Sequence, residues 1–186
     1  MYQRSMNRML RREVFMLFGV WNFSALHDAY VREDRRLLKY CRWDAIDSDL
    51  LTNKAKIILE RMDPNHLKRD EREWRAEILW FWYHHATNWA IWNFKDQQMA
   101  LSFVRAALSY QDECKRADDG RQNRITRLLW FLLNGNLKQA EGHILNWPAN
   151  AGLAERDTAI RIVRRYLFGE FFSQPAAPPN YHRHYL

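Results

Sequence analysis

The sequence contains few cysteine, glycine and proline residues. Its 186 residues include two Cys, six Gly and five Pro. Cys41 and Cys114 are too few for a disulfide framework or a four-ligand zinc site. We therefore expect two free thiols in a reducing compartment, with the cytoplasm as the first choice and mitochondrial targeting as the alternative. The shortage of glycine and proline favours long elements over many short strands and turns.

Long hydrophobic runs are also absent. A membrane-spanning helix needs about 18 or more apolar residues, and the most aromatic segment, near residue 80, is interrupted by His84, His85 and Asn88. We therefore expect no membrane span. Catalytic patterns are missing too, such as a glycine-rich phosphate loop, an ordered nucleophile and base, or the His-Glu-x-x-His motif. Accordingly, we expect neither an enzyme nor a bound cofactor or metal.

Positive charge and aromatic side chains are abundant. The formal net charge is +7, the isoelectric point is near 9.6, and 15% of the residues are Phe, Trp or Tyr. Rings of this size supply a packed core or anchors at an interface. The charge favours acidic partners, which include nucleic acid, an acidic protein face and a lipid surface.

Arginine is concentrated near the amino terminus. Four arginines precede the first acidic residue, and a short apolar run follows them. Targeting sequences share these features, but this apolar run is too short for a secretory signal, so we interpret the segment as an amphipathic helix. Arg8, Arg11 and Arg12 are predicted to form an electrostatic arm that contacts a partner.

The spacing of apolar residues predicts an all-α fold with about eight helices. Ser24 is the expected N-cap of the second helix, and Asp63-Pro64 is expected to stop the third. The expected helices cover residues 5–20, 24–42, from 47 or 48 to 63, 67–94, 97–116, 123–133, 137–146 and 153–172.

One domain of this kind is expected over residues 1–172. We divide it into amino-terminal helices over 1–64, central hairpins over 65–152 and a capping helix over 153–172. Residues 173–186 contain three prolines and little apolar surface, so they are expected to form an extended tail.

Two short turns are followed by helices with similar patterns. In one, an Asn-Gly-Asn turn precedes Ala140 and, four residues later, Ile144. In the other, Asp96 precedes Ala100 and Val104. Glycine supplies the positive φ angle that ends a helix within a short connection, and alanine allows two antiparallel helices to approach closely.

These segments resemble the helical hairpins of the tetratricopeptide-repeat family, over about residues 79–148. The two alanines lie 40 residues apart (100 to 140), whereas the family's period is about 34. The resemblance implies stacked antiparallel hairpins after an amino-terminal helical lead-in, and a concave surface that binds a peptide or protein. It also implies that the last helix caps the stack, with Arg161, Arg164 and Arg165 on its outer side.

The candidate partner-binding residues of the hairpins lie on the helix over 67–94. Most of its aromatic side chains are expected in the core. Four residues are instead predicted to be exposed and to contact a partner, namely Trp80, His84, Asn88 and Ile91. The expected function is a non-enzymatic interaction scaffold or assembly subunit that binds another protein or a multi-subunit complex. The alternative is binding of nucleic acid, or of a nucleoprotein complex, through the amino-terminal arginines.

Overall fold

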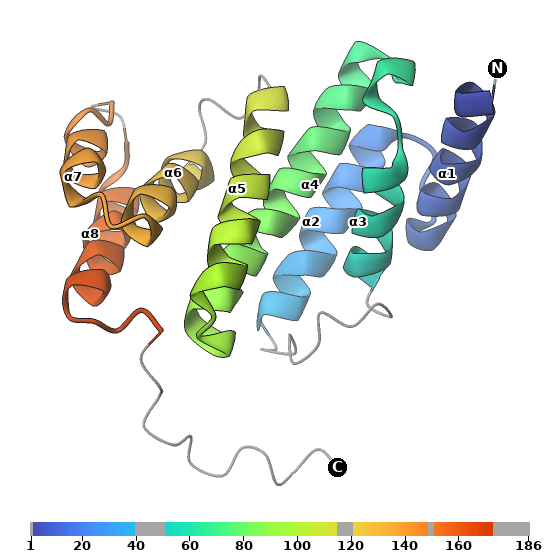
Figure 1. The fold of residues 1–186 in the computed structure, drawn as a ribbon. Coiled ribbons are helices and arrows are strands. Elements are labelled where there is room, and N and C mark those ends of the chain that lie inside the picture. The colour runs from blue at the N-terminus through green and yellow to red at the C-terminus, as the bar shows by residue number, and fades with distance from the viewer. Residues whose placement is uncertain (1, 40–50, 115–120, 149–150, 173–186) are drawn as a thin grey trace, which may run out of the picture.

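The computed structural model describes residues 2–39, 51–114, 121–148 and 151–172. Within these ranges every regular element is helical, so the predicted all-α class is confirmed. The helices are α1 (Tyr2–Phe18), α2 (Phe23–Lys39), α3 (Leu51–Arg61), the 3-10 helix η1 (Pro64–His66), α4 (Arg69–Trp89), the π-helix η2 (Ala90–Phe94), α5 (Gln97–Glu113), α6 (Arg121–Leu133), α7 (Leu137–Leu145) and α8 (Leu153–Leu167) (Figure 1).

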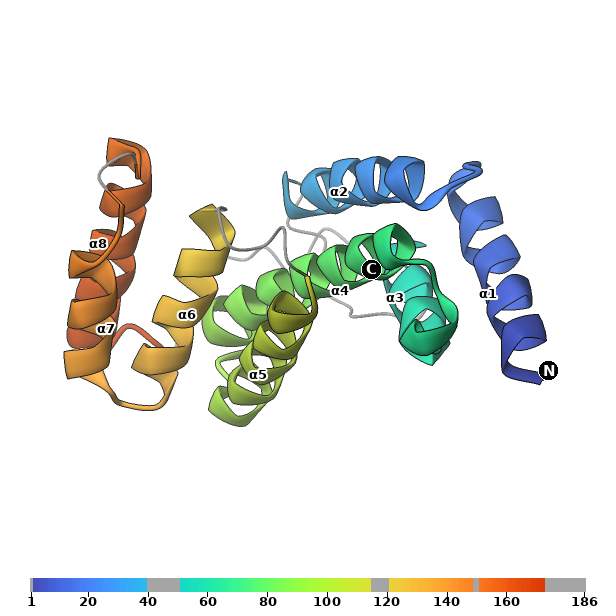
Figure 2. The same ribbon diagram turned by 90° about the horizontal axis from the view of Figure 1, so that it is seen from above.

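The helices form an elongated stack. Helices α4 and α5 run antiparallel in its centre, α2 and α3 pack on α4, and α1 packs on α2 and α3 (Figures 1 and 2). On the other side α6 packs on α5, and both α7 and α8 pack on α6. The stack therefore has two ends, one formed by α1 and the other by α7 and α8.

The core consists of two clusters that follow each other along the chain. The first joins α1 to α4 and includes Leu10, Tyr30 and Trp82; the second joins η2 to α8 and includes Leu128. Phe103 of α5 packs against both clusters. The aromatic helix α4 is therefore covered from several sides, as its two apolar faces predict.

The predicted turn signals act as helix caps. The Asp96 carboxylate accepts the backbone N–H of Met99 (2.9 Å), and the Asn136 side chain accepts that of Gln139 (3.2 Å). Gly135 adopts a φ of +71° between α6 and α7. Ala100 and Ala140 are both buried, as expected of close contacts between helices. Stacking of the tetratricopeptide type stays a prediction.

Helix boundaries differ from the predicted ones where local signals competed. Asn22, not Ser24, caps α2, because its side chain accepts the Ala25 N–H at 2.8 Å. The last helix ends at Leu167 rather than at residue 172, because Gly169 takes a φ of +69° and turns Phe171 back into the core against Trp92. The predicted start of the third helix and the tail over 173–186 lie outside the described residues.

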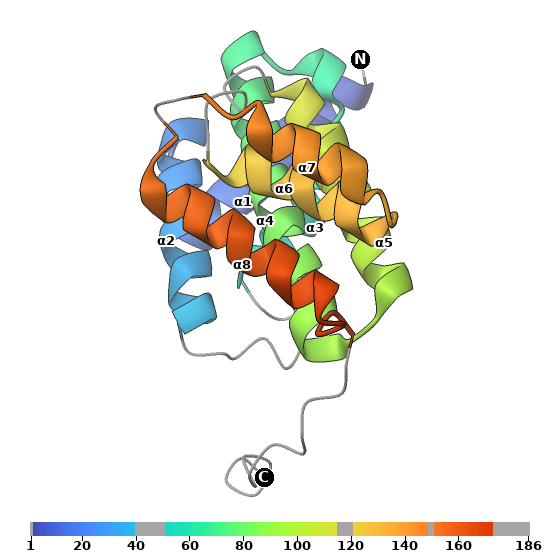
Figure 3. The same ribbon diagram turned by 90° about the vertical axis from the view of Figure 1, so that its left-hand side faces the viewer.

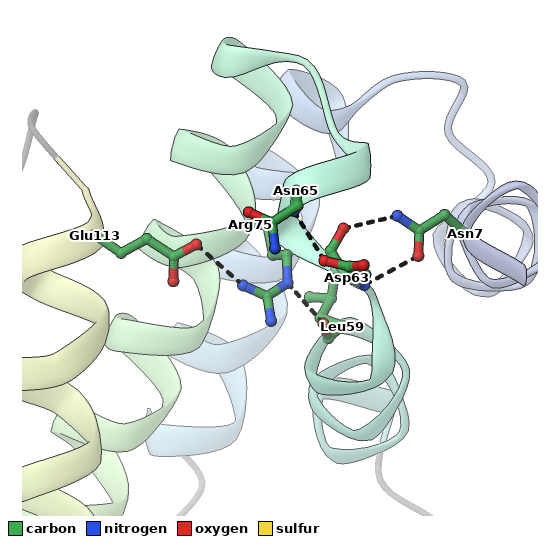
Figure 4. A network of polar contacts seen from close by, with 6 residues as sticks. All are labelled: Asn7, Leu59, Asp63, Asn65, Arg75 and Glu113. Atoms are coloured by element: carbon green, nitrogen blue, oxygen red, sulfur yellow. Dashed lines mark hydrogen bonds and ion pairs between the residues drawn. The ribbon is translucent and has the colours of Figure 1, made fainter. Parts of the chain in front are cut away.

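Buried polar side chains join the amino-terminal helices. Asn7 of α1 donates to the Asp63 carbonyl (2.8 Å) and accepts the Asp63 N–H (3.0 Å) just after α3 (Figure 4). Arg75 of α4 reaches the Leu59 carbonyl of α3 (2.8 Å) and Glu113 of α5 (3.4 Å). These contacts fix how α1, α3 and α5 lie around α4.

None of the described helices is long and apolar enough to cross a membrane.

Candidate partner-binding groove

Of the four predicted partner residues, which lie in α4 and η2, three are buried and one is half-buried. Trp80 and His84 are 7% and 5% exposed, Ile91 is fully buried, and Asn88 is half-buried. The prediction that they are exposed is therefore wrong. The physical reason is that other helices pack on these residues. His84 Nδ1 lies 2.7 Å from the hydroxyl of Thr126 on α6, Trp80 packs in the first core cluster and Ile91 in the second.

His84 is the polar centre of this buried contact. Burial disfavours the charged imidazolium and lowers the pKa of His84 from 6.5 to about 4. The Trp80 ring lies 6.0 Å from the His84 ring, and the Asn88 amide donates to the His84 carbonyl (3.1 Å). Both ring nitrogens of His84 have polar neighbours, the Thr126 hydroxyl and the Asn88 amide. We therefore interpret His84 as a neutral histidine that contributes to packing and does not bind a ligand.

The stability of the protein is expected to fall with acid because of His84. In the unfolded chain His84 takes up a proton below about pH 6.5, whereas in the folded protein it does so only near pH 4. The free energy of unfolding is therefore full at pH 8 and decreases as the pH falls from about 6.5 to about 4. At pH 5 the loss is about 2 kcal/mol. Urea denaturation of the wild type and of a His84→Gln variant at both pH values measures it. An equal pH dependence of both proteins would contradict this assignment.

The arginine arm of α1 is only partly free for a partner. Arg8 and Arg12 are exposed, as is Arg4. Arg11, in contrast, pairs with Glu71 of α4 (2.8 Å), and its guanidinium lies 5.6 Å from the ring centre of Phe23. The exposed basic row of α1 therefore consists of Arg4, Arg8 and Arg12, and Arg11 holds α1 against the stack.

A groove lies at the opposite end of the stack, between α7 and α8. Both helices pack on α6 and run beside each other at the end of the molecule (Figure 3). The open space between them is about 370 Å³. The groove is lined almost entirely by apolar side chains: Leu137, Ala140, Glu141, Ile144, Leu145, Val163 and Leu167.

Large apolar side chains next to this groove are exposed to solvent. Leu145 is 77% exposed and Leu167 is 60% exposed. Leu153, Ile160 and Leu167 follow each other at intervals of seven residues, so they form one row on the outer side of α8. A contiguous apolar surface of this kind, in contrast to scattered single residues, marks a place where another molecule binds.

Basic side chains surround the apolar surface. The charged side chains that are exposed on α7 and α8 are five basic and two acidic: Lys138, Arg156, Arg161, Arg164, Arg165, Glu141 and Asp157. The predicted exposure of Arg161, Arg164 and Arg165 is confirmed. The end of a helical stack normally presents a polar face, whereas α8 also presents exposed Leu and Ile side chains. The role of α8 as a cap stays a prediction.

One ion pair holds α8 in place to form the groove. The Arg124 guanidinium of α6 donates two hydrogen bonds of 2.8 Å to the Glu155 carboxylate, which is 5% exposed at the start of α8. The Arg124 carbonyl also lies 2.9 Å from Nε2 of His143 on α7. Arg124 thus connects both walls of the groove to α6.

Sequence reasoning missed this groove, although one signal was visible. The seven-residue spacing of Leu153, Ile160 and Leu167 puts these residues in one row, about 100° around α8 from its buried Ala159. Of the described residues, no three His, Cys, Asp or Glu side chains gather as a metal site requires.

Comparisons with protein-family models, with curated proteins and with solved structures find no match for this chain.

Proposed function

We propose that the protein is a non-enzymatic helical scaffold, which binds an acidic amphipathic helix of a partner protein in the groove between α7 and α8. The observation that carries this proposal is the open apolar groove with exposed Leu145 and Leu167 at its edges. An amphipathic helix buries its apolar face in a groove through residues spaced by three, four and seven positions.

The basic residues near the groove favour a partner with negative charge. The five basic residues exposed on α7 and α8, against two acidic ones, favour a helix with Glu or Asp beside its apolar face. Stacking of a second copy end to end is disfavoured, because the exposed face of α1 is also basic, with Arg4, Arg8 and Arg12 against Glu13. Two basic ends repel each other, whereas an acidic partner is attracted to this one.

A pair of designed helical peptides tests the proposal. Both carry leucines on one face; one has Glu and the other has Lys beside them. We expect the acidic peptide to bind the full chain with a dissociation constant in the micromolar range, and the Lys peptide to bind at least about tenfold more weakly, because charge complementarity suppresses the wrong partner. Fluorescence anisotropy of labelled peptides gives both affinities.

Variants of the groove and of the other end provide the matched comparison. Leu145→Gln with Leu167→Gln is expected to weaken the acidic peptide at least about tenfold, since each lost apolar contact is worth about 1 kcal/mol or more. Met9→Gln with Met16→Gln changes exposed residues of α1 and should leave the affinity unchanged. Equal binding of the two peptides, or full binding by the groove variant, would exclude this function. Tight oligonucleotide binding that falls steeply between about 50 and 200 mM salt would favour the nucleic-acid alternative.

A further inference from the structure

The outer face of α1 is a second exposed surface with a different shape and composition. Tyr2, Met9 and Met16 follow each other at intervals of seven residues and are 73%, 56% and 66% exposed. Trp21, in the connection from α1 to α2, is 92% exposed. Exposed apolar side chains indicate a binding surface where they gather, and here they lie on one helix and at its end.

A row of arginines on α1 comes next to this apolar row at Arg12, whereas Arg4 lies farther around the helix. Arg4, Arg8 and Arg12 are spaced by four residues, so they form a line along α1, and all three are exposed. The angle of about 100° per helical residue places Arg12 next to Met9 and Met16. The inner face of α1, which includes Leu10 and Val14, packs in the core. Because the core holds the inner face, α1 presents a basic row and an apolar row together to the outside.

We infer that this face of α1, together with Trp21, binds the surface of an anionic lipid bilayer. An interfacial helix lies in the plane of the membrane, with its apolar row at the boundary of the acyl chains and its arginines among the anionic headgroups. Trp and Tyr are the side chains that membrane interfaces favour most, because their rings are apolar and carry a polar group. The flexible Met side chains adapt to an irregular surface.

The shape of this end distinguishes a lipid surface from other acidic partners. Helix α1 lies at the edge of the stack, and α2 and α3 lie on one side of it only (Figure 2). It therefore forms a convex ridge, whereas a partner helix needs a groove such as that between α7 and α8. A nucleic acid satisfies Arg4, Arg8 and Arg12 through its phosphates but leaves Met9 and Met16 in water. A lipid surface satisfies both rows.

Binding of the full chain to vesicles tests this inference. Vesicles of phosphatidylcholine mixed with phosphatidylserine are compared with vesicles of phosphatidylcholine alone, by sedimentation at low salt. We expect binding to the anionic vesicles only, reduced by salt because the headgroup attraction is screened. The Trp21 indole should move to a less polar environment, so the fluorescence of the wild type should shift to shorter wavelength on binding, and a Trp21→Phe variant should lose most of this shift.

Three double variants distinguish the contributions of the arginine row and the apolar row to vesicle binding from that of the overall basic charge. Arg8→Ala with Arg12→Ala should reduce vesicle binding at least about tenfold, since each arginine near an anionic surface contributes about fivefold. Met9→Gln with Met16→Gln should reduce it to a similar degree. Arg161→Ala with Arg164→Ala removes the same charge from α8 and should change binding less than about twofold.

Three results would overturn the inference. The first is no binding of the wild type to the anionic vesicles. The second is an equal loss in the α1 and α8 arginine variants, which would show attraction by net charge alone. The third is an oligonucleotide that binds the wild type and the Met9→Gln, Met16→Gln variant equally while vesicles do not bind, which would assign the arginine row to nucleic acid. The groove between α7 and α8 is unchanged in the α1 variants, so peptide binding there is an independent result.

Discussion

Replacing Arg75 by alanine is expected to lower the free energy of unfolding by about 2 to 3 kcal/mol, because the buried Leu59 carbonyl loses its hydrogen bond from a charged group and Glu113 loses a partly buried partner. Arg75 is 4% exposed, donates to the Leu59 carbonyl at 2.8 Å and lies 3.4 Å from Glu113 (Figure 4). Its guanidinium also lies 5.8 Å from the ring centre of Tyr110. The variant therefore loses contacts to α3 and α5 at once.

Urea denaturation followed by circular dichroism measures this change, with Arg69→Ala as the matched control. Arg69 lies on the same helix and pairs with Glu73 at 3.2 Å, but its side chain is 78% exposed. Exposed pairs of this kind contribute less than about 1 kcal/mol. Arg75→Lys keeps the charge without the planar guanidinium and is expected to fall between the two. If the two alanine variants were equally stable, Arg75 would not have the role assigned to it.

The helices and their short connections could be predicted from the sequence because the signals are local. Asp96 and Asn136 each lie three residues before the N–H that they accept, and Gly135 supplies a positive φ that no neighbour has to impose. Such contacts depend on a few consecutive residues. The same is true of the stop at Asp63-Pro64, which the structure confirms by ending α3 at Arg61.

Contacts between distant helices could not be predicted in this way. Helix α4 has apolar residues on most of its surface, and its sequence does not say which neighbour covers which face. Trp80, His84 and Ile91 were therefore assigned to the surface, although the structure buries all three. His84, for example, contacts Thr126 of α6, which lies 42 residues away in sequence. The partner of Arg11, Glu71, lies 60 residues away.

The two surfaces proposed for binding share a physical origin. In an inner helix of the stack, neighbours on two sides bury two apolar faces. In α1 and α8 the second face has no neighbour among the described helices, so Met9, Met16, Ile160 and Leu167 remain exposed. Apolar spacing in the sequence is the same in both cases, and only the position of the helix in the stack decides whether the residues form core or surface.

The last prediction joins the stability of the stack to the function proposed for its end. Arg124→Met is expected to release α8 from α6, because Glu155 would remain buried, 5% exposed, without the two 2.8 Å hydrogen bonds from Arg124. Removing one partner of a buried ion pair lowers the free energy of unfolding by about 3 to 5 kcal/mol. A loss of this size is enough to open a terminal helix before the rest of the protein unfolds. Hydrogen exchange of the α8 amides should accelerate while that of α4 stays slow.

Opening α8 removes one wall of the groove, so the acidic helical peptide should lose most of its affinity for Arg124→Met. Vesicle binding by α1, at the far end, should be unchanged. Combining Arg124→Met with Glu155→Met replaces the ion pair by apolar side chains, and such replacements are often neutral or stabilising. The double variant is therefore expected to recover both the slow exchange of α8 and peptide binding. Recovery of slow exchange without peptide binding would show that the charges themselves, rather than the position of α8, form the site; unchanged exchange in the single variant would show that the pair does not hold α8.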